Sequence, residues 1–92
     1  MSMDSLFKAL ADPNRRKIIQ LLKNKDLSVT DMLEKFDFTQ ASLSHHLDIL
    51  KRADLVTTER RGQFIIYSLN TSVFEETAAI FLNLFKYDKR ES

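Results

Sequence analysis

The sequence predicts a mainly α-helical domain that carries one β-hairpin near its C-terminal end. Apolar residues recur every three or four positions through most of the 92 residues, as in helices with one buried face. Between Leu55 and Leu69 the spacing changes to two, which is typical of strands. The single glycine, Gly62, lies inside that segment, where a tight turn needs a residue with freedom at φ.

Length and composition limit the class of protein. A chain of this length makes one domain, residues 1–92, and one glycine with one proline disfavours both a many-turned β fold and disorder. No cysteine is present, so disulfides and thiolate metal sites are excluded. We expect a cytoplasmic protein, since no signal peptide is recognisable and no apolar run nears the roughly 20 residues of a membrane span.

The first two helices follow from apolar spacing and one cap. Leu6, Phe7 and Leu10 predict a short first helix. Asp12 and Pro13 predict the start of a second helix, because Asp is a good cap and Pro suits the first helical position. The apolar face of this second helix, which ends near residue 24, consists of Ile18, Ile19, Leu21 and Leu22.

Two further helices are separated by a connection of about two or three residues, the length that a helix-turn-helix uses. After a brief extended piece at residues 27–28, Ser28 with Asp31 forms a capping-box pattern for the third helix. Thr39 caps a fourth helix, which runs to about Ala53. Its apolar stripe consists of Leu43, Leu47 and Leu50.

The hairpin is predicted from strands at about residues 56–60 and 65–69, and its tip consists of Arg61, Gly62 and Gln63. Ser72 with Glu75 predicts a cap for the last helix. This helix spans about residues 73–85, and the charged residues after it are expected to fray.

The apolar residues of the last helix cover an arc of about 200°, which is wider than burial against a single core requires. The order of elements, α-α-(β)-α-α-β-β-α, describes a winged helix-turn-helix. From about residue 6 to residue 85 the chain resembles the ArsR family of repressors, and within it the metal-independent, SdpR-like autorepressors. The resemblance is carried by LADPNRRKIIQLL, SLSHHLDILKRADLV and RRGQFIIYSLN.

Two groups of polar side chains are candidates for DNA contact. Short side chains that donate and accept hydrogen bonds suit base edges, and the fourth helix presents Gln40, Ser42, Ser44 and His45. Guanidinium groups suit phosphates and narrow grooves, and the hairpin tip carries Arg60, Arg61 and Gln63. The alternatives are an exposed polar helix without a ligand and a hairpin tip that only aids solubility. Because the fourth helix and the hairpin are adjacent in the sequence and the chain resembles the family, contact with DNA is favoured.

Other polar residues have simpler explanations. His46 lies beside the apolar stripe and is expected to be partly buried and hydrogen-bonded. Arg15 or Arg16 is expected to pair with Asp12 or another acid and to hold the fold together.

No cofactor, metal site or catalytic site is expected. Metal-sensing members of the family often carry a cysteine pair at the start of the third helix, where this chain reads LSVTD. Others place ligands on the last helix, which here has Glu75 and Glu76 but no histidine. His45 and His46 diverge by about 100° and do not face one ion. An enzyme is disfavoured because Ser44 and His45 diverge as well, and no glycine-flanked nucleophile is present.

The resemblance implies a homodimeric repressor, with double-stranded DNA and a second copy of the chain as partners. Two copies of the fourth helix would enter successive major grooves of an inverted-repeat operator, and the target would include the promoter of the protein's own gene. An anti-repressor protein would be a further partner, although no residue indicates one. The alternative is a winged helix that binds only protein. The expected dimer surface consists of Leu6, Phe7, Leu10, Phe74, Ala78, Phe81, Leu82 and Phe85.

Overall fold

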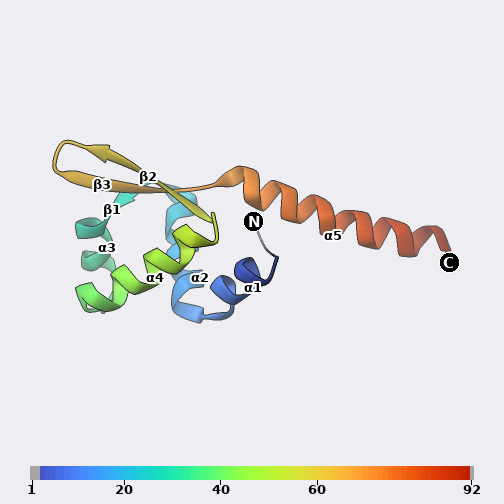
Figure 1. Ribbon diagram of the computed structural model, residues 1–92, viewed down its shortest axis with the longest axis horizontal. Helices are drawn as coiled ribbons and strands as arrows, with labels where there is room; N and C mark the ends of the chain where they lie inside the picture. Colours follow the sequence, from blue (N-terminus) through green and yellow to red (C-terminus); the bar gives the residue numbers. More distant parts are fainter. Residues whose placement is uncertain (1–2, 92) are drawn as a thin grey trace.

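The computed structural model describes residues 3–91, with the backbone alone for residues 85–91. Its elements follow the predicted order, so the winged helix-turn-helix, mainly α with a β-hairpin wing, is confirmed (Figure 1). The helices are α1 (Met3–Ala11), α2 (Pro13–Asn24), α3 (Val29–Lys35), α4 (Gln40–Arg52) and α5 (Thr71–Glu91). The strands are β1 (Leu27–Ser28), β2 (Val56–Arg61) and β3 (Phe64–Leu69).

Side-chain caps start three of the helices where the sequence predicts them. The carboxylate of Asp12 accepts a hydrogen bond from the backbone N–H of Asn14 at 2.7 Å, which fixes the start of α2. The hydroxyl oxygen of Thr39 accepts from the backbone N–H of Ser42 at 3.1 Å and starts α4. The predicted capping box of α3 is present between Ser28 and Asp31.

The cap predicted for the last helix is wrong. Helix α5 begins at Thr71, so Ser72 lies inside its first turn and is not the cap. The carbonyl of Asn70 accepts from the backbone N–H of Val73 at 3.2 Å. The side-chain amide of Asn70 donates to the carbonyl of Asp54 at 2.9 Å, so this residue ties the start of α5 to the loop that follows α4.

The three strands form one antiparallel sheet in the order β1-β3-β2, so the brief extended piece is a true strand that pairs with the hairpin. Arg61 pairs with Phe64 and belongs to β2, which leaves Gly62 and Gln63 as the two-residue turn. Gly62 has φ of +63°, the left-handed conformation that glycine adopts without a steric penalty. The tip is therefore one residue shorter than predicted.

One cluster of buried apolar side chains forms the core between the helices and the sheet. The predicted stripe of α4 is confirmed, because Leu43, Leu47 and Leu50 are at most 1% exposed. This burial turns the opposite face of α4 to the surface. The other members of the core are Leu6, Ala9, Ile18, Ile19, Leu22, Leu27, Met32, Ala53, Leu55, Val56 and Val73.

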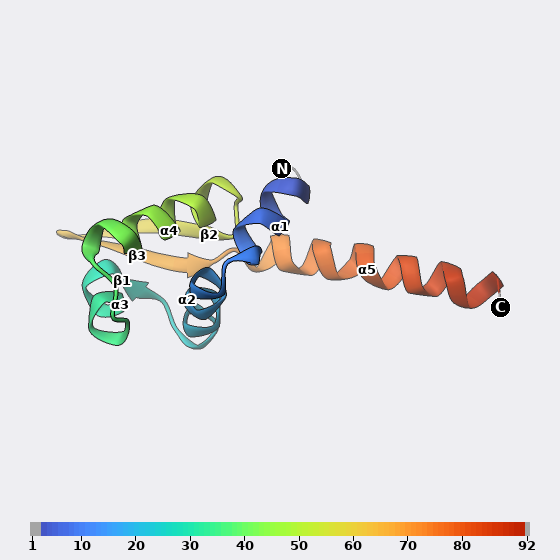
Figure 2. The same cartoon turned by 90° about the horizontal axis from the view of Figure 1, so that it is seen from below.

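Helix α5 leaves the body of the protein after its first turns and projects away from it (Figures 1 and 2). It accounts for the elongated shape of the chain, 54 × 24 × 22 Å. The predicted end of this helix near residue 85 is wrong, since the helix continues to Glu91 through residues that include no glycine or proline. Among residues 3–91, no helix has both the length and the apolar character needed to cross a membrane.

Candidate nucleic-acid interface

The outward face of α4 presents the short polar side chains that the sequence singles out. Gln40, Ser44 and His45 are exposed in the first two turns. Ser42 is half-buried, so it lies at the flank of this face and offers less of its side chain to a ligand. Further along the helix, Asp48 and Arg52 form an exposed ion pair at 2.7 Å, which adds little stability because water screens both charges.

The hairpin tip presents Arg60, Arg61 and Gln63, all exposed. The Arg61 guanidinium donates to the Glu59 carboxylate at 3.0 Å, and Nε of Arg60 donates to the carbonyl of Gly62 at 3.2 Å. The ion pair is 59% exposed at Arg61 and 63% exposed at Glu59. A surface pair of this kind contributes at most about 1 kcal/mol, so a phosphate can replace the carboxylate at small cost.

The two arginines of the tip point to opposite faces of the hairpin, because side chains alternate along a strand. Thr58 pairs with Tyr67, and Arg60 lies two residues beyond Thr58 on the same face. The pKa of Tyr67 is raised, mainly by burial and secondly by the carboxylate of Asp48 on α4. Tyr67 packs against the core, and Val56, on the same face as Thr58 and Arg60, is 3% exposed. The face with Tyr67 and Arg60 is therefore the one turned toward the helices, and Arg61 lies on the other face.

The structure brings the two candidate groups to one end of the molecule. In both views the hairpin tip and the beginning of α4 lie at the end opposite to the C-terminus of α5 (Figures 1 and 2). This end combines the exposed polar turns of α4 with the arginines of the tip. A double helix offers both ligands that such a surface suits, base edges in a groove and phosphates beside it.

His46 has the place that the sequence predicts. It is 8% exposed, and its ring packs against Phe38 with the centroids 5.5 Å apart. Burial lowers the pKa of His46, the charge of Asp12 opposes that shift, and the charges of Arg15 and His45 add to it. The lowered pKa favours the neutral form of the ring, and the side chain faces away from the outward side of α4.

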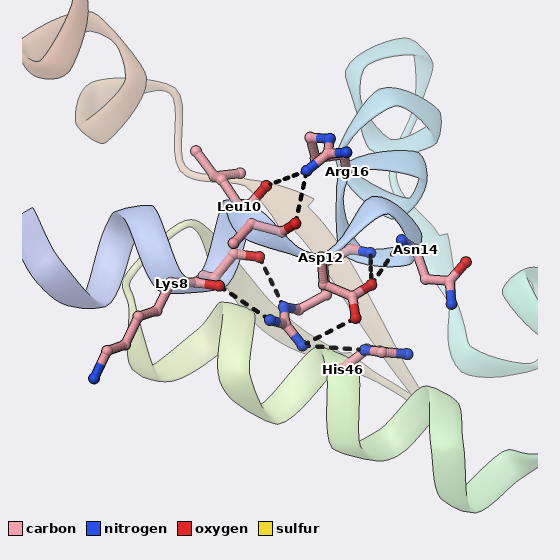
Figure 3. A network of polar contacts seen from close by, with 9 residues as sticks. Lys8, Leu10, Asp12, Asn14, Arg16 and His46 are labelled. Atoms are coloured by element: carbon pink, nitrogen blue, oxygen red, sulfur yellow. Dashed lines mark hydrogen bonds and ion pairs between the residues drawn. The ribbon is translucent and has the colours of Figure 1, made fainter.

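Arg15 and Arg16 hold the fold together, and the predicted ion pair of Arg15 with Asp12 is present, but the shortest bonds of both side chains go to carbonyl groups (Figure 3). Arg15 donates to the carbonyls of Ala9 at 2.7 Å and Lys8 at 3.0 Å, while its ion pair with Asp12 spans 3.9 Å. Arg16 donates to the carbonyls of Leu10 and Ala11 at 2.7 and 2.9 Å. These are the last four carbonyls of α1, which a helix leaves without an internal partner.

The residues of the expected dimer surface differ in exposure in the single chain. Leu6 is 1% exposed and belongs to this chain's own core, so its place in a surface between two copies is corrected. Phe7, the next residue, turns outward with 47% exposed and meets Phe81 of α5, with the ring centroids 6.2 Å apart. Leu10 and Phe74 are half-buried, Ala78, Phe81 and Leu82 are exposed, and the side chain of Phe85 lies outside the described residues.

Two features of the described residues were not predicted from the sequence. Arg15 reaches helix α4 as well as α1, since its guanidinium lies 3.4 Å from Nδ1 of His46. Phe64 and Ile65 are 46% and 38% exposed on β3, beside the tip. Among the described side chains, residues 3–84, no three histidine or acidic groups cluster closely enough to hold a metal ion.

Comparisons with known proteins agree with this geometry. The model of the arsR family of bacterial regulatory proteins matches residues 12–58, about half of the chain. The transcriptional repressor SdpR of Bacillus subtilis (strain 168) is 48% identical over 81 residues, which cover 88% of this chain and 90% of that protein. The arsenical resistance operon repressor of Staphylococcus aureus is 36% identical over 74 residues, which cover 80% of this chain and 71% of that protein.

Among solved structures, the ArsR-like transcriptional regulator from Rhodococcus sp. RHA1 has the same fold. The TM-score is 0.86 at 25% identity, and the match covers 96% of this chain and 82% of that one. The matched segment of the family model contains α2, α3, α4 and the start of β2. The chain therefore belongs to the arsR family of bacterial regulatory proteins, which are winged helix-turn-helix DNA-binding regulators and not enzymes.

Proposed function

We propose that this protein is a transcriptional repressor that binds an inverted-repeat operator as a homodimer. The observation that carries the proposal is the pairing of the exposed polar turns of α4 with the arginines of the hairpin at one end of the molecule. Two relatives described above are named as repressors, which supports repression. No described cluster suggests a metal as the signal that would release the DNA.

The apolar surface of α1 and α5 supports a second copy of the chain as the partner. Phe7 and Phe81 join the two helices, and Leu82 and Leu84 continue the surface along α5 with 67% and 58% exposed. Burial of each such side chain contributes about 1.5–3 kcal/mol when it is complete. A helix that projects from the body, as α5 does, gains that stabilisation when it packs against an equivalent helix (Figure 2).

A two-fold dimer presents two α4 helices and two hairpin tips to the same side of a duplex. Operator half-sites that suit such a dimer lie about 34 Å apart, one helical turn of DNA. We propose that the dimer represses by covering a promoter, and that the promoter of its own gene is one target. This places its action in the cytoplasm, where bacterial DNA lies.

A gel-shift titration tests the proposal. Purified protein is added to the DNA upstream of its own gene, and to a random duplex of equal length, at two salt concentrations and with or without a chelator. We expect retarded bands that weaken as salt rises, tighter binding to the upstream DNA, and no effect of the chelator. Absence of any shift would contradict DNA binding and favour a protein-binding winged helix, whereas equal affinity for both duplexes would contradict autoregulation alone.

A further inference from the structure

Arg15 lies at the point where three helices meet. Its side chain is 13% exposed and extends from the first turn of α2. Two of its nitrogens donate to the carbonyls of Lys8 and Ala9 at the end of α1, as described above. The third, Nη1, lies 3.4 Å from Nδ1 of His46 in the middle of α4 and 3.9 Å from the carboxylate of Asp12 (Figure 3).

Helices α1 and α4 are also joined through the core, in which Leu6 and Ala9 of α1 and Leu43, Leu47 and Leu50 of α4 are buried. At the surface an open hollow of about 200 Å³ lies between the two helices, lined by Ser5, Lys8, Ile49, Arg52 and Ala53. The contact through Arg15 therefore adds a polar link between α1 and α4 to their apolar packing.

The neighbouring arginine supplies a natural comparison. Arg16 also donates to carbonyls at the end of α1, those of Leu10 and Ala11, but none of its described contacts reaches α4. Both arginines thus stabilise the end of the same helix, and of these two side chains only Arg15 has a described bond to the DNA-reading helix.

We propose that Arg15 is a positioning residue for DNA recognition: by holding the end of α1 and the ring of His46 together, it sets the orientation of α4 relative to the apolar surface of α1 and α5. The inference rests on the proposed function, because this orientation matters only when two α4 helices of a dimer must match one duplex. Phe7, one residue before Lys8, places that apolar surface within a single helical turn of the contact.

The contact requires one protonation state of His46. A guanidinium has donors only, so Nδ1 of the ring must accept, and the ring proton then resides on Nε2. A second proton on the ring would place a donor against a donor and a positive charge beside Arg15. The charged or titratable groups that face the ring are Asp12 and Arg15 from α2 and His45 from α4 itself, and Asp12 alone opposes this repulsion.

The test compares the two arginines on two duplexes. One duplex is recovered by selection from a random pool with the wild-type protein, and the other is an unselected duplex of equal length. We expect Arg15→Gln to weaken binding to the selected duplex by about tenfold or more and to the unselected duplex by less than about twofold. Arg16→Gln should lower the melting temperature but leave the ratio of the two affinities within about twofold of the wild type.

Two substitutions of His46 test the same contact without removing the arginine. His46→Asn keeps an acceptor near the position of Nδ1 and has no titratable group, whereas His46→Leu removes the acceptor. We expect the ratio of the wild type to fall as the pH drops below about 6.5 toward the lowered pKa of His46, and the ratio of His46→Asn to stay constant over the same range. His46→Leu should lower the ratio at every pH.

Several outcomes would overturn the inference. One is an equal ratio of selected to unselected affinity for Arg15→Gln and Arg16→Gln. Another is a His46→Leu protein that keeps the wild-type ratio. A third is a ratio that depends on pH in the same way for the wild type and for His46→Asn. If Arg15→Gln does not fold, the two His46 variants decide the question. A wild-type protein that selects no duplex would instead refute the proposed function itself, and with it this inference.

Discussion

Leu82 offers the sharpest test of the apolar surface on α5. It is 67% exposed in the single chain and belongs to α5, the helix that projects from the body (Figure 1). In a two-fold dimer, burial of Leu82 in one copy implies burial of Leu82 in the other. We predict that Leu82→Gln, which removes the apolar side chain but keeps a good helix former, will dissociate the dimer.

The size of the effect follows from the exposed fraction. Complete burial of a leucine contributes about 1.5–3 kcal/mol, so the exposed two-thirds of Leu82 is worth about 1–2 kcal/mol in each copy. Two copies make about 2–4 kcal/mol, which raises the dissociation constant of the dimer by a factor of about 30–1,000. A change of this size moves the monomer–dimer transition across the micromolar range.

Sedimentation equilibrium over a range of concentrations measures this constant. The matched control is Asn83→Gln, because Asn83 is also exposed on α5 but lies on the polar side of the helix, outside the apolar arc. We expect the control to have the same dissociation constant as the wild type. Equal constants for Leu82→Gln and Asn83→Gln, or a wild-type protein that is monomeric at micromolar concentration, would refute the argument.

Three further predictions concern DNA contact and pH. Replacing Arg60 and Arg61 together with glutamine should weaken binding to all duplexes and lower the slope of a salt titration by up to about two units; an unchanged slope would show that the wing does not touch phosphates. Gln40→Ala should cost about 1–3 kcal/mol more on the selected duplex than on an unselected one in competition assays, and equal losses would show that α4 is not the reader. Because burial lowers the pKa of His46, the unfolded chain takes up a proton near pH 6.5 that the folded chain excludes. The contribution of neutral His46 to the free energy of unfolding is therefore fully present above about pH 6.5 and is lost as the pH drops toward the folded pKa. Urea unfolding should show this loss in the wild type and not in His46→Asn. A wild-type free energy of unfolding that does not change with pH would contradict the prediction.

The fold was predictable where interactions between residues close in the sequence determine the backbone conformation. Asp12, Ser28 and Thr39 cap helices by bonds that span two or three residues, so the sequence contains both partners. The hairpin depends on Gly62 at positive φ and on alternating side chains. The prediction that failed concerns the start of α5. Ser72 resembles a cap in the sequence, but Asn70 precedes the first turn, and its side chain binds the distant loop after α4.

The candidate site was predictable as a list of exposed polar residues but not as an arrangement. Both Leu6 and Phe7 were assigned to the dimer surface from the sequence, yet Leu6 is buried in the core and Phe7 is exposed. That difference depends on how α1 tilts against α2, which spacing does not encode. The double role of Arg15 was hidden for the same reason, since its bond to His46 joins positions 31 residues apart.

The ion pair predicted between Arg15 and Asp12 is present, but the shorter hydrogen bonds of the two arginines were not predicted. Two consecutive arginines near Asp12 predict an ion pair, because opposite charges are the visible partners in a sequence. The structure shows that free carbonyls at the end of α1 provide the short bonds, 2.7 Å for Arg15 to Ala9 and 2.7 Å for Arg16 to Leu10. Every helix end has such carbonyls, so their partners can be named only when the geometry is known.

Hydroxyl-radical footprinting of the wild-type protein on its selected duplex shows whether the two α4 helices of one dimer read successive turns of DNA. We expect two protected segments of inverted sequence, centred about 10 base pairs apart on one face of the duplex. A single protected segment at saturating protein, or two segments on opposite faces, would contradict it.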